Sequence, residues 1–575
     1  MGRNPLSRHT VTIATAVVLS VGLILGTAAC SSDSSKNDNQ AGDRPSAAPK
    51  ATLNQINPVD PTLLKQGGTL NFPVDQYSSQ WNVLNAASNN EVSTVDTVQG
   101  MLPYIFRSSA DNKLTVNTDY VTSAETVLKD GKQVSTYKIN PKAKWSDGTP
   151  ITWKDFQANW KVQNGKDSKY NATTTTGYSQ IASVEKGASD TEAVVTYDTP
   201  FADWQSLFAP LYPASQIDTP AKFNNAYKGK IPVTAGPFKV GEMNSTTKVV
   251  SIVRDPAWWG TKAVLDKINF RTVDIASAPG AFASGEIDLT DIGPDVSAYK
   301  QAKTVPNASI RVAGGPNLRH IVANGQSPVL KDQRVRQALF MALNRDAIGK
   351  ADLNGLPWPI KPLNNHFLVN NADGYKDNAG ALGTYDPAKA NELLDAAGWK
   401  KSGEFRTKNG KTLQVTFVIP ASVPISANEA QLTTAMLKAV GVKVKTSTSA
   451  SDVFFDDLNA GKFDLTAFSG IGAVPFFPLS NSQASFQAPK DGNIGQNFSR
   501  LGSAELDAAM LKAGQQVDHQ EYLNEVNEAD ALLWKLAIDL PLYQRPQIWA
   551  TKPGLANFGA FGFQNTDFAK IGFTK

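Results

Sequence analysis

The sequence predicts a mixed α/β protein (α/β or α+β) built from more than one lobe. The chain has 575 residues, which is enough for roughly three to four domains with large packed cores. From Gly67 onward, short β-branched segments bounded by turn residues alternate with amphipathic segments of helical period, and no repeat is evident. Strands that alternate with helices are typical of this fold class.

The N-terminal segment predicts export. Residues 1–9 carry two arginines and no acid, residues 11–26 are almost wholly apolar, and small residues precede Cys30. This order is typical of a secretory signal, expected to cover residues 1–29, although an uncleaved anchor over residues 11–29 is the alternative. A lone thiol is a liability in an oxidising compartment unless it is consumed, which argues against the anchor. The segment resembles a bacterial lipoprotein signal, so we expect Cys30 to be lipidated and to hold the protein on the extracytoplasmic face of the cell membrane.

Residues 30–66 are expected to form a lipid-anchored, disordered linker. Residues 31–61 are polar, interrupted by proline and poor in large apolar side chains. Such a composition cannot bury enough apolar surface to offset the entropy of ordering. The linker would hold the folded part of the chain away from the membrane.

Strand-like segments follow. Residues 67–72 lead into a first strand, and residues 134–140, 193–199 and 249–253 are further short β-branched runs.

Five later segments have the apolar spacing of helices. In residues 334–348 the apolar side chains fall on one face, and in residues 387–397 an Asp386-Pro387 start supplies a cap before Gly398 ends the helix. Residues 428–440, 503–512 and 522–536 are the others.

Composition excludes several kinds of function. Lys and Arg number 56 and Asp and Glu 52, a net charge of +4, which is too balanced for a nucleic-acid binder. One cysteine allows no internal disulfide and no cysteine-based zinc site. His9, His320, His366 and His519 show no metal-ligand spacing, and the common motifs of serine hydrolases, phosphate loops and zinc proteases are absent. We therefore expect no metal, no cofactor and no nucleic-acid partner, and we expect binding rather than catalysis.

Residues 145–156 (WSDGTPITWKDF) predict a turn between a strand and a helix capped near Thr152. The segment closely resembles a signature of the family 5 extracellular solute-binding proteins, the peptide, nickel and oligosaccharide receptors of bacterial ABC importers. Further matches follow in the family's order at residues 234–238 (TAGPF), 254–259 (RDPAWW), 332–339 (DQRVRQAL), 385–398 (YDPAKANELLDAAG) and 538–543 (IDLPLY). These residues are expected to build turns, caps and helix faces rather than to contact a ligand.

The resemblance implies a type II periplasmic-binding-protein-like fold. Two lobes would be joined by two crossovers, near Arg319 and Tyr543, an extra subdomain would sit on the first lobe, and the lobes would close on ligand at a hinge. Mapped onto this chain, lobe I would comprise residues 67–106, 231–318 and 545–575, the extra subdomain residues 107–230, and lobe II residues 319–544.

The expected ligand contacts depart from the peptide-binding members. Those proteins carry G-W-x-A-D-Y after a strand ending F-D-[LV], and its aspartate pairs with the α-ammonium of the peptide. Counted from Asp464 without gaps, the tryptophan position here is Gly470 and the aspartate position is Ala473, with no acid before Asp491. Either the ligand lacks an ammonium there (a modified or cyclic peptide, a sugar, a siderophore-like molecule or a lipid), or another acid replaces the aspartate, or the loop packs elsewhere.

Position in the family implies further candidates. The expected ligand-binding residues are Asn89, Asn90, Trp358, Ser469, Gly470, Tyr543 and Gln544. His320 and His366 are weaker candidates, and an ordinary polar loop around residue 89 or a core tryptophan at 358 are the alternatives.

The predicted function is that of a substrate-binding lipoprotein of an ABC importer. As a monomer, it would capture a peptide or peptide-like solute between its lobes and deliver it to the transmembrane permease subunits. A non-transport lipoprotein of the same fold, acting as a sensor or regulator of cell-envelope assembly, is the alternative, and a secreted hydrolase is the third class.

Overall fold

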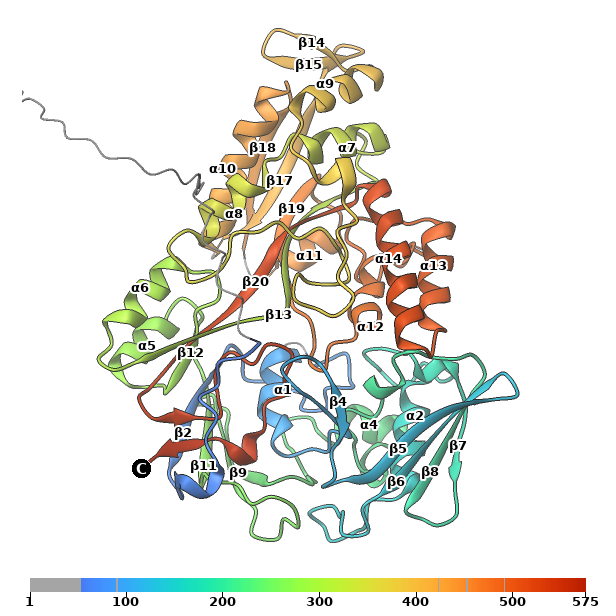
Figure 1. Cartoon of the computed structure of the whole chain (residues 1–575), viewed down its shortest axis with the longest axis vertical. Helices are drawn as coiled ribbons and strands as arrows, with labels where there is room; N and C mark the ends of the chain where they lie inside the picture. Colours follow the sequence, from blue (N-terminus) through green and yellow to red (C-terminus); the bar gives the residue numbers. More distant parts are fainter. Residues whose placement is uncertain (1–52, 89–90, 422, 451–452, 491) are drawn as a thin grey trace, which may run out of the picture. The chain divides into compact units, whose positions relative to one another are not determined.

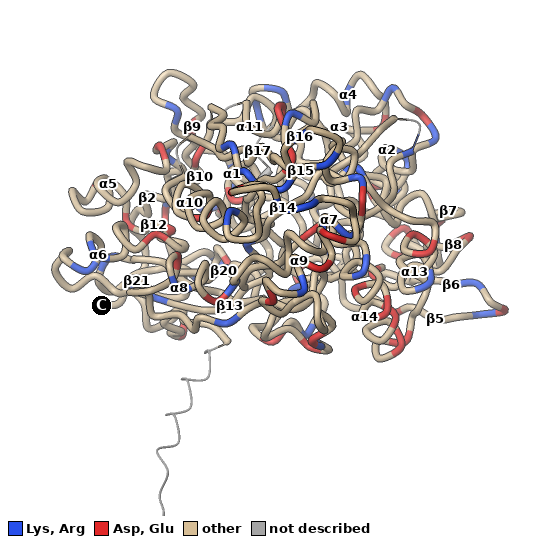
Figure 2. Tube along the Cα trace, turned by 90° about the horizontal axis from the view of Figure 1, so that it is seen from above, with Lys and Arg blue, Asp and Glu red and all other residues tan. Residues whose placement is uncertain are grey.

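The computed structural model describes residues 53–88, 91–421, 423–450, 453–490 and 492–575, and from residue 53 on these belong to one compact unit. The predicted signal and Cys30 lie outside the described residues. Within them the protein is a mixed α/β structure, as predicted (Figure 1). Lysines and arginines are interspersed with acidic residues along the trace (Figure 2), in keeping with the small net charge.

A six-stranded mixed sheet carries the candidate site (Figure 1). Two of its strands, β13 and β20, are long and antiparallel, and they pair from Ser309 opposite Thr551 to Val322 opposite Asp539. In sheet order the strands are β12 (Leu289–Asp291), β20 (Asp539–Thr551), β13 (Ser309–Ala323), β19 (Leu465–Gly470), β17 (Gln414–Pro420) and β18 (Lys443–Ser449).

Helices cover this sheet. Helices α8 and α10 pack on β20, β17 and β18, whereas α13 packs on α14. Apolar side chains such as Ile321, Leu339 and Phe417 form one continuous core beneath the helices. The helices of this part of the chain are α7 (Gln333–Met341), α8 (Arg345–Leu353), α9 (Pro387–Ala396), α10 (Pro424–Ala439), α11 (Phe454–Asn459), α12 (Pro478–Ser482), α13 (Ala504–Gly514) and α14 (His519–Leu536).

Two further four-stranded sheets share a second core, to which Phe72, Tyr137 and Phe270 contribute. One has the order β2 (Thr69–Val74), β11 (Lys267–Thr272), β10 (Val249–Arg254) and β9 (Phe238–Asn244). The other has the order β5 (Val121–Lys129), β6 (Lys132–Ile139), β8 (Glu192–Tyr197) and β7 (Ile181–Lys186). The predicted strands at residues 134–140, 193–199 and 249–253 are thus confirmed within a few residues.

The remaining elements complete the fold. The helices are α1 (Glu91–Gln99), α2 (Trp153–Gln163), α3 (Ala214–Ile217), α4 (Pro220–Asn225), α5 (Ala278–Ser284) and α6 (Val296–Thr304). The strands are β1 (Leu64–Lys65), β3 (Phe106–Ser108), β4 (Leu114–Val116), β14 (Lys400–Ser402), β15 (Phe405–Lys408), β16 (Lys411–Thr412), β21 (Leu555–Ala556) and β22 (Gly572–Thr574). Short 3-10 turns lie at Pro61–Leu63, Tyr178–Gln180, Trp204–Ser206, Gly380–Gly383, Gln483–Ser485 and Phe568–Lys570.

The turn and cap motifs have the structural roles predicted for them. The Asp147 carboxylate accepts hydrogen bonds from the Thr149 backbone and hydroxyl, and Thr152 and Asp155 form a reciprocal capping box at the start of α2. Asp386 accepts a hydrogen bond from the Lys389 backbone N–H at 2.8 Å, so it caps α9 as expected.

Two sequence predictions need correction. The helix expected over residues 334–348 is two helices, because the side chain of Asn344 caps α8 and α7 ends at Met341. The disordered linker expected over residues 30–66 is wrong for its last part, since β1 pairs with β22 and Leu64 is fully buried. Strand pairing to the far end of the chain orders this short segment.

The two predicted crossover points lie side by side, with Arg319 on β13 opposite Tyr543 on β20. The lobe boundaries drawn at residues 318/319 and 544/545 therefore fall within two neighbouring strands. Those boundaries stay a prediction. No helix in the described part of the chain combines the length and apolar character needed to cross a bilayer.

Candidate ligand-binding site

A cavity of about 330 Å³ opens beside the end of β19. This volume is at the lower end of the range for small-molecule sites, about 300–1,000 Å³. The cavity is lined by Pro316, Leu318, His320 and Val322 of β13, His366, Phe367 and Val369 of the following loop, Phe455, residues 468–472, Phe476, Asn481, Ser482, Ser485, Phe486, Gln496, Phe498, Ser499, Ile538, Asp539 and Pro541. Except for Pro316 and Leu318, these residues belong to the predicted lobe II.

Three phenylalanines form one side of the cavity, and we call Phe455, Phe468 and Phe498 the phenylalanine wall. Their ring centroids lie 5.7–5.8 Å apart in every pair, a spacing at which aromatic pairs attract one another. Phe455 is 49% exposed although it is a large apolar side chain. A wall of this kind favours an apolar or aromatic ligand group.

His320 lies next to the wall and is held by Asp539. The imidazole Nδ1 is 2.6 Å from Asp539 Oδ2, and the ring meets Phe468 edge-on with centroids 4.4 Å apart. Because the carboxylate only accepts, we assign the Nδ1 proton to this hydrogen bond. Nε2 is buried and has no hydrogen-bond partner among the described residues.

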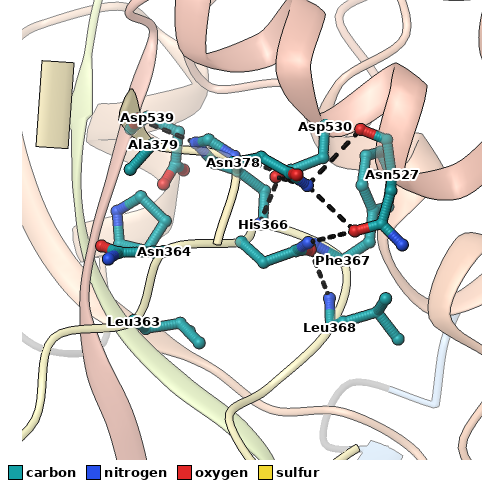
Figure 3. A network of polar contacts seen from close by, with 12 residues as sticks. Leu363, Asn364, His366, Phe367, Leu368, Asn378, Ala379, Asn527, Asp530 and Asp539 are labelled. Atoms are coloured by element: carbon teal, nitrogen blue, oxygen red, sulfur yellow. Dashed lines mark hydrogen bonds and ion pairs between the residues drawn. The ribbon is translucent and has the colours of Figure 1, made fainter. Parts of the chain in front are cut away.

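His366 and Asp530, whose side chains are both fully buried, lie at the centre of a polar network (Figure 3). Asp530 on α14 accepts hydrogen bonds from the His366 backbone N–H and Nδ1, each at 2.7 Å, and from Asn378 at 2.8 Å. The second ring nitrogen lies 3.1 Å from the Asp539 carbonyl oxygen. Burial lowers the pKa of His366, but the Asp530 carboxylate and the hydrogen bond to it outweigh burial, so the net shift is upward. The network fixes the loop that carries His366 and Phe367 into the cavity.

The chain leaves β19 close against β13. A Cβ on Gly472 would stand 2.6 Å from a side-chain atom of Pro316 and 2.7 Å from its carbonyl oxygen, so only glycine fits there. The Gly472 N–H donates to Asn317 Oδ1 at 3.0 Å. Ala473, at the position of the family's aspartate, is exposed and does not line the cavity.

The next segment contacts parts of the chain assigned to lobe I and its extra subdomain. Asn112 exchanges two hydrogen bonds with the Phe476 backbone, at 2.7 and 3.0 Å, and the Phe476 ring stacks on Phe563. Asp203 accepts from the Ser480 N–H at 3.1 Å and hydroxyl at 2.5 Å. Burial raises the pKa of the Asp203 carboxyl, and its hydrogen bonds oppose that shift. The chain segment that lines the cavity therefore continues directly into a segment that contacts the rest of the fold.

The predicted ligand-binding residues separate into three groups. Ser469 and Gly470 line the cavity. Asn89 and Asn90 lie outside the described residues. Tyr543, Gln544 and Trp358 do not line the cavity. The Trp358 indole donates to the Gln544 carbonyl, the Gln544 amide donates to the Gly315 carbonyl, and Tyr543 donates to Asp352.

A buried ionic cluster lies where β13 and β20 pair at Arg319 and Tyr543, the two predicted crossover points. Arg319 donates to Glu429 from Nε at 2.8 Å and from its terminal nitrogen, which also donates to Ser426 at 2.9 Å. Burial, together with the Glu429 charge, raises the pKa of Asp352 to about 8, although its hydrogen bond from Tyr543 and the Arg319 charge act against the shift. The cluster joins β13 to α10 through Arg319 and Glu429, and β20 to α8 through Tyr543 and Asp352.

Sequence reasoning named His320 and His366 but not their partners. Asp539 lies 219 residues after His320 and Asp530 lies 164 residues after His366, so no local spacing signals either pair. Phe455 and Phe498 belong to no motif or spacing that would have predicted a place in the site. No group of three or more metal-ligand side chains is found in the part of the chain that the structure describes.

Comparison with known proteins identifies the family. Residues 115–493 match the sequence profile of the bacterial extracellular solute-binding proteins, family 5 Middle, about two thirds of the chain. The chain belongs to this family. It is 35% identical over 530 residues to the oligopeptide-binding protein OppA of Mycobacterium tuberculosis, covering 91% of this solute-binding protein and 88% of OppA.

Solved structures agree with the fold. The periplasmic EDTA-binding protein EppA superposes on this solute-binding protein with a TM-score of 0.83 and 26% identity, over 92% of this chain and 99% of EppA. AppA from Bacillus subtilis, in complex with a nonapeptide, gives a TM-score of 0.74 and 19% identity over 89% of this chain and 100% of AppA. The type II periplasmic-binding-protein fold is thereby confirmed.

Proposed function

We propose that this protein captures a peptide or peptide-like solute and delivers it to an ABC permease. One observation carries the proposal. Strand β13 pairs with β19 as far as Gly470, whereas β17 pairs with β19 only at Leu465 and Thr466. The second edge of β19 is thus left uncovered by β17 along residues 467–470, three of which line the cavity. An extended peptide can add to such an edge by main-chain hydrogen bonds.

Related proteins support the choice of ligand class. OppA is named an oligopeptide-binding protein, and the AppA structure is a complex with a nonapeptide. We further infer the lobe boundaries given above, with the contacts of Asn112, Asp203 and Phe563 to residues 476–480 as part of a closed arrangement. Native mass spectrometry of the protein purified from its own host, without refolding, tests the proposal. A retained peptide mass supports it, whereas a retained sugar or lipid mass contradicts the ligand class.

We expect N-acetylation of a bound peptide to change its dissociation constant by less than about threefold. Asp539 is the only carboxylate among the described residues that line the cavity, and it is already paired with His320. A hydrogen bond to a charged group is worth about 1.5–3 kcal/mol, so loss of an ammonium clamp would weaken binding about ten- to hundred-fold. Calorimetry with matched free and acetylated peptides decides the point, and a penalty above tenfold would restore an ammonium clamp.

We propose that the protein is held on the membrane by a lipid on Cys30, with peptide capture on the extracytoplasmic face. Cys30→Ala is then expected to move the protein from the membrane fraction to the soluble fraction, because the acyl chains supply the membrane affinity. Ser31→Ala is the matched control and is expected to stay with the membrane. Fractionation and immunoblotting provide the measurement, and membrane retention of the Cys30 variant would argue for an uncleaved anchor.

A further inference from the structure

The cavity is poor in charge. Among the residues that the structure describes, its lining includes no lysine and no arginine, and the single carboxylate there, Asp539, is paired with His320. A charged ligand group placed here would lose its hydration without gaining a partner, which costs several kcal/mol. The part of the ligand that enters the cavity is therefore uncharged, and the phenylalanine wall gives it apolar contacts.

One polar atom in this apolar setting stands out. In the tautomer that donates its Nδ1 proton to Asp539, the uncharged form of the His320 ring presents a lone pair on Nε2, an atom that has no partner among the described residues. A buried acceptor without a donor is costly, typically by about 1–3 kcal/mol. Phe468, which meets the ring edge-on, belongs to both the wall and the uncovered stretch of β19. A ligand that moves the Phe468 side chain could thus reach Nε2 while it lies along β19.

We propose, on the basis of the peptide-binding function above, that the cavity takes an uncharged apolar or aromatic side chain of the ligand and that His320 Nε2 accepts a hydrogen bond from the adjacent main-chain N–H. Asp539 is a positioning residue, since it fixes the tautomer and the direction of the ring. This hydrogen bond would satisfy a buried ring nitrogen that has no partner among the described residues. Recognition therefore selects the side chain and one amide of the peptide, without an ionic contact.

Calorimetry of the mature chain with the pentapeptides Ala-Ala-Xaa-Ala-Ala, where Xaa is Phe, Leu, Lys or Glu, tests the proposal. The Phe and Leu peptides are expected to bind at least tenfold more tightly than the Lys and Glu peptides. His320→Asn keeps a donor for Asp539 but places no group at Nε2, so it is expected to weaken the Phe peptide about tenfold. His320→Gln carries an amide near the Nε2 position and is expected to recover part of that loss. His519→Asn, an exposed histidine, is the control and is expected to bind as the wild type does.

The outcomes distinguish this proposal from the function on which it rests. If none of the four peptides binds, the proposed function fails and the inference fails with it. If they bind without a preference for Phe and Leu, or equally well to His320→Asn, peptide binding stands and the inference is overturned. A ligand-side measurement covers the case of a variant that does not fold: N-methylation of the Xaa amide is expected to weaken the Phe peptide about tenfold on the wild type. Equal affinity for the methylated peptide would overturn the role of Nε2.

Discussion

Replacing Arg319 by methionine is expected to lower the free energy of unfolding by about 3–5 kcal/mol at pH 7. The Arg319 and Glu429 side chains are 3% and 0% exposed, so methionine would leave the glutamate charge buried without its cation. Asp352 cannot compensate, because it is itself an acid whose pKa burial raises to about 8. In this variant the Glu429 carboxylate must take up a proton when the chain folds. Its stability is therefore expected to fall as pH rises, and the deficit should be smaller at pH 5 than at pH 7.

The double variant Arg319→Met, Glu429→Leu is the matched control. It removes both charges and replaces them by apolar groups of similar length, a change that is often neutral or stabilising for buried ion pairs. Urea unfolding at pH 5 and pH 7 measures the effect in both variants. A single variant within about 1 kcal/mol of the wild type at pH 7 would mean that water or another cation reaches Glu429.

The fold could be predicted where its signals are local. The Asp147 turn, the Thr152–Asp155 capping box and the Asp386 cap each involve residues within three positions of one another, and the sequence identified all three segments. The break between α7 and α8 was missed because the apolar period continues through Leu343, although Asn344 is a good N-cap residue. When two consecutive helices face the same core, their apolar residues can keep one helical period, so the pattern does not reveal the break between them.

Contacts between distant segments could not be predicted from local patterns. Leu64 is held in the fold because its strand, β1, pairs with β22, about 500 residues later in the sequence. The candidate site also depends on contacts between residues that are far apart in the sequence. Ser469 and Gly470 were named through a motif, whereas the pairing of His320 with Asp539 depends on the register of β13 against β20, where His320 lies opposite Pro541. That register is fixed by the folding of the whole sheet.

Replacing Asp530 by alanine is expected to cost about 3–5 kcal/mol of stability and to weaken peptide binding as well. The fully buried carboxylate accepts from the His366 N–H, from its ring and from Asn378. Alanine leaves the two buried His366 donors without this acceptor and takes one of its acceptors from Asn378, which keeps its hydrogen bond to Asn527. Each buried donor left unsatisfied typically costs about 1–3 kcal/mol, with incomplete additivity. His366 and Phe367 line the cavity, so the loss of their anchor should also lower the affinity. Urea unfolding and peptide calorimetry measure the two effects.

Asp530→Asn separates the charge from the hydrogen bonds, because asparagine keeps an acceptor oxygen at the same place. In the wild type the folded pKa of His366 lies above its ordinary value, so the resulting stability is fully present below about pH 6.5 and is lost as pH rises through the folded pKa. The asparagine variant lacks the charge that raises this pKa and should show a flatter decline above pH 6.5. Because the pKa of Asp352 is raised to about 8, its contribution to stability falls as pH rises from about 4 to about 8, equally in both proteins. The difference between the two curves of stability against pH therefore isolates His366. Parallel profiles at pH 6, 7 and 8 would show that the Asp530 charge does not control the histidine and that the network is held by neutral hydrogen bonds alone.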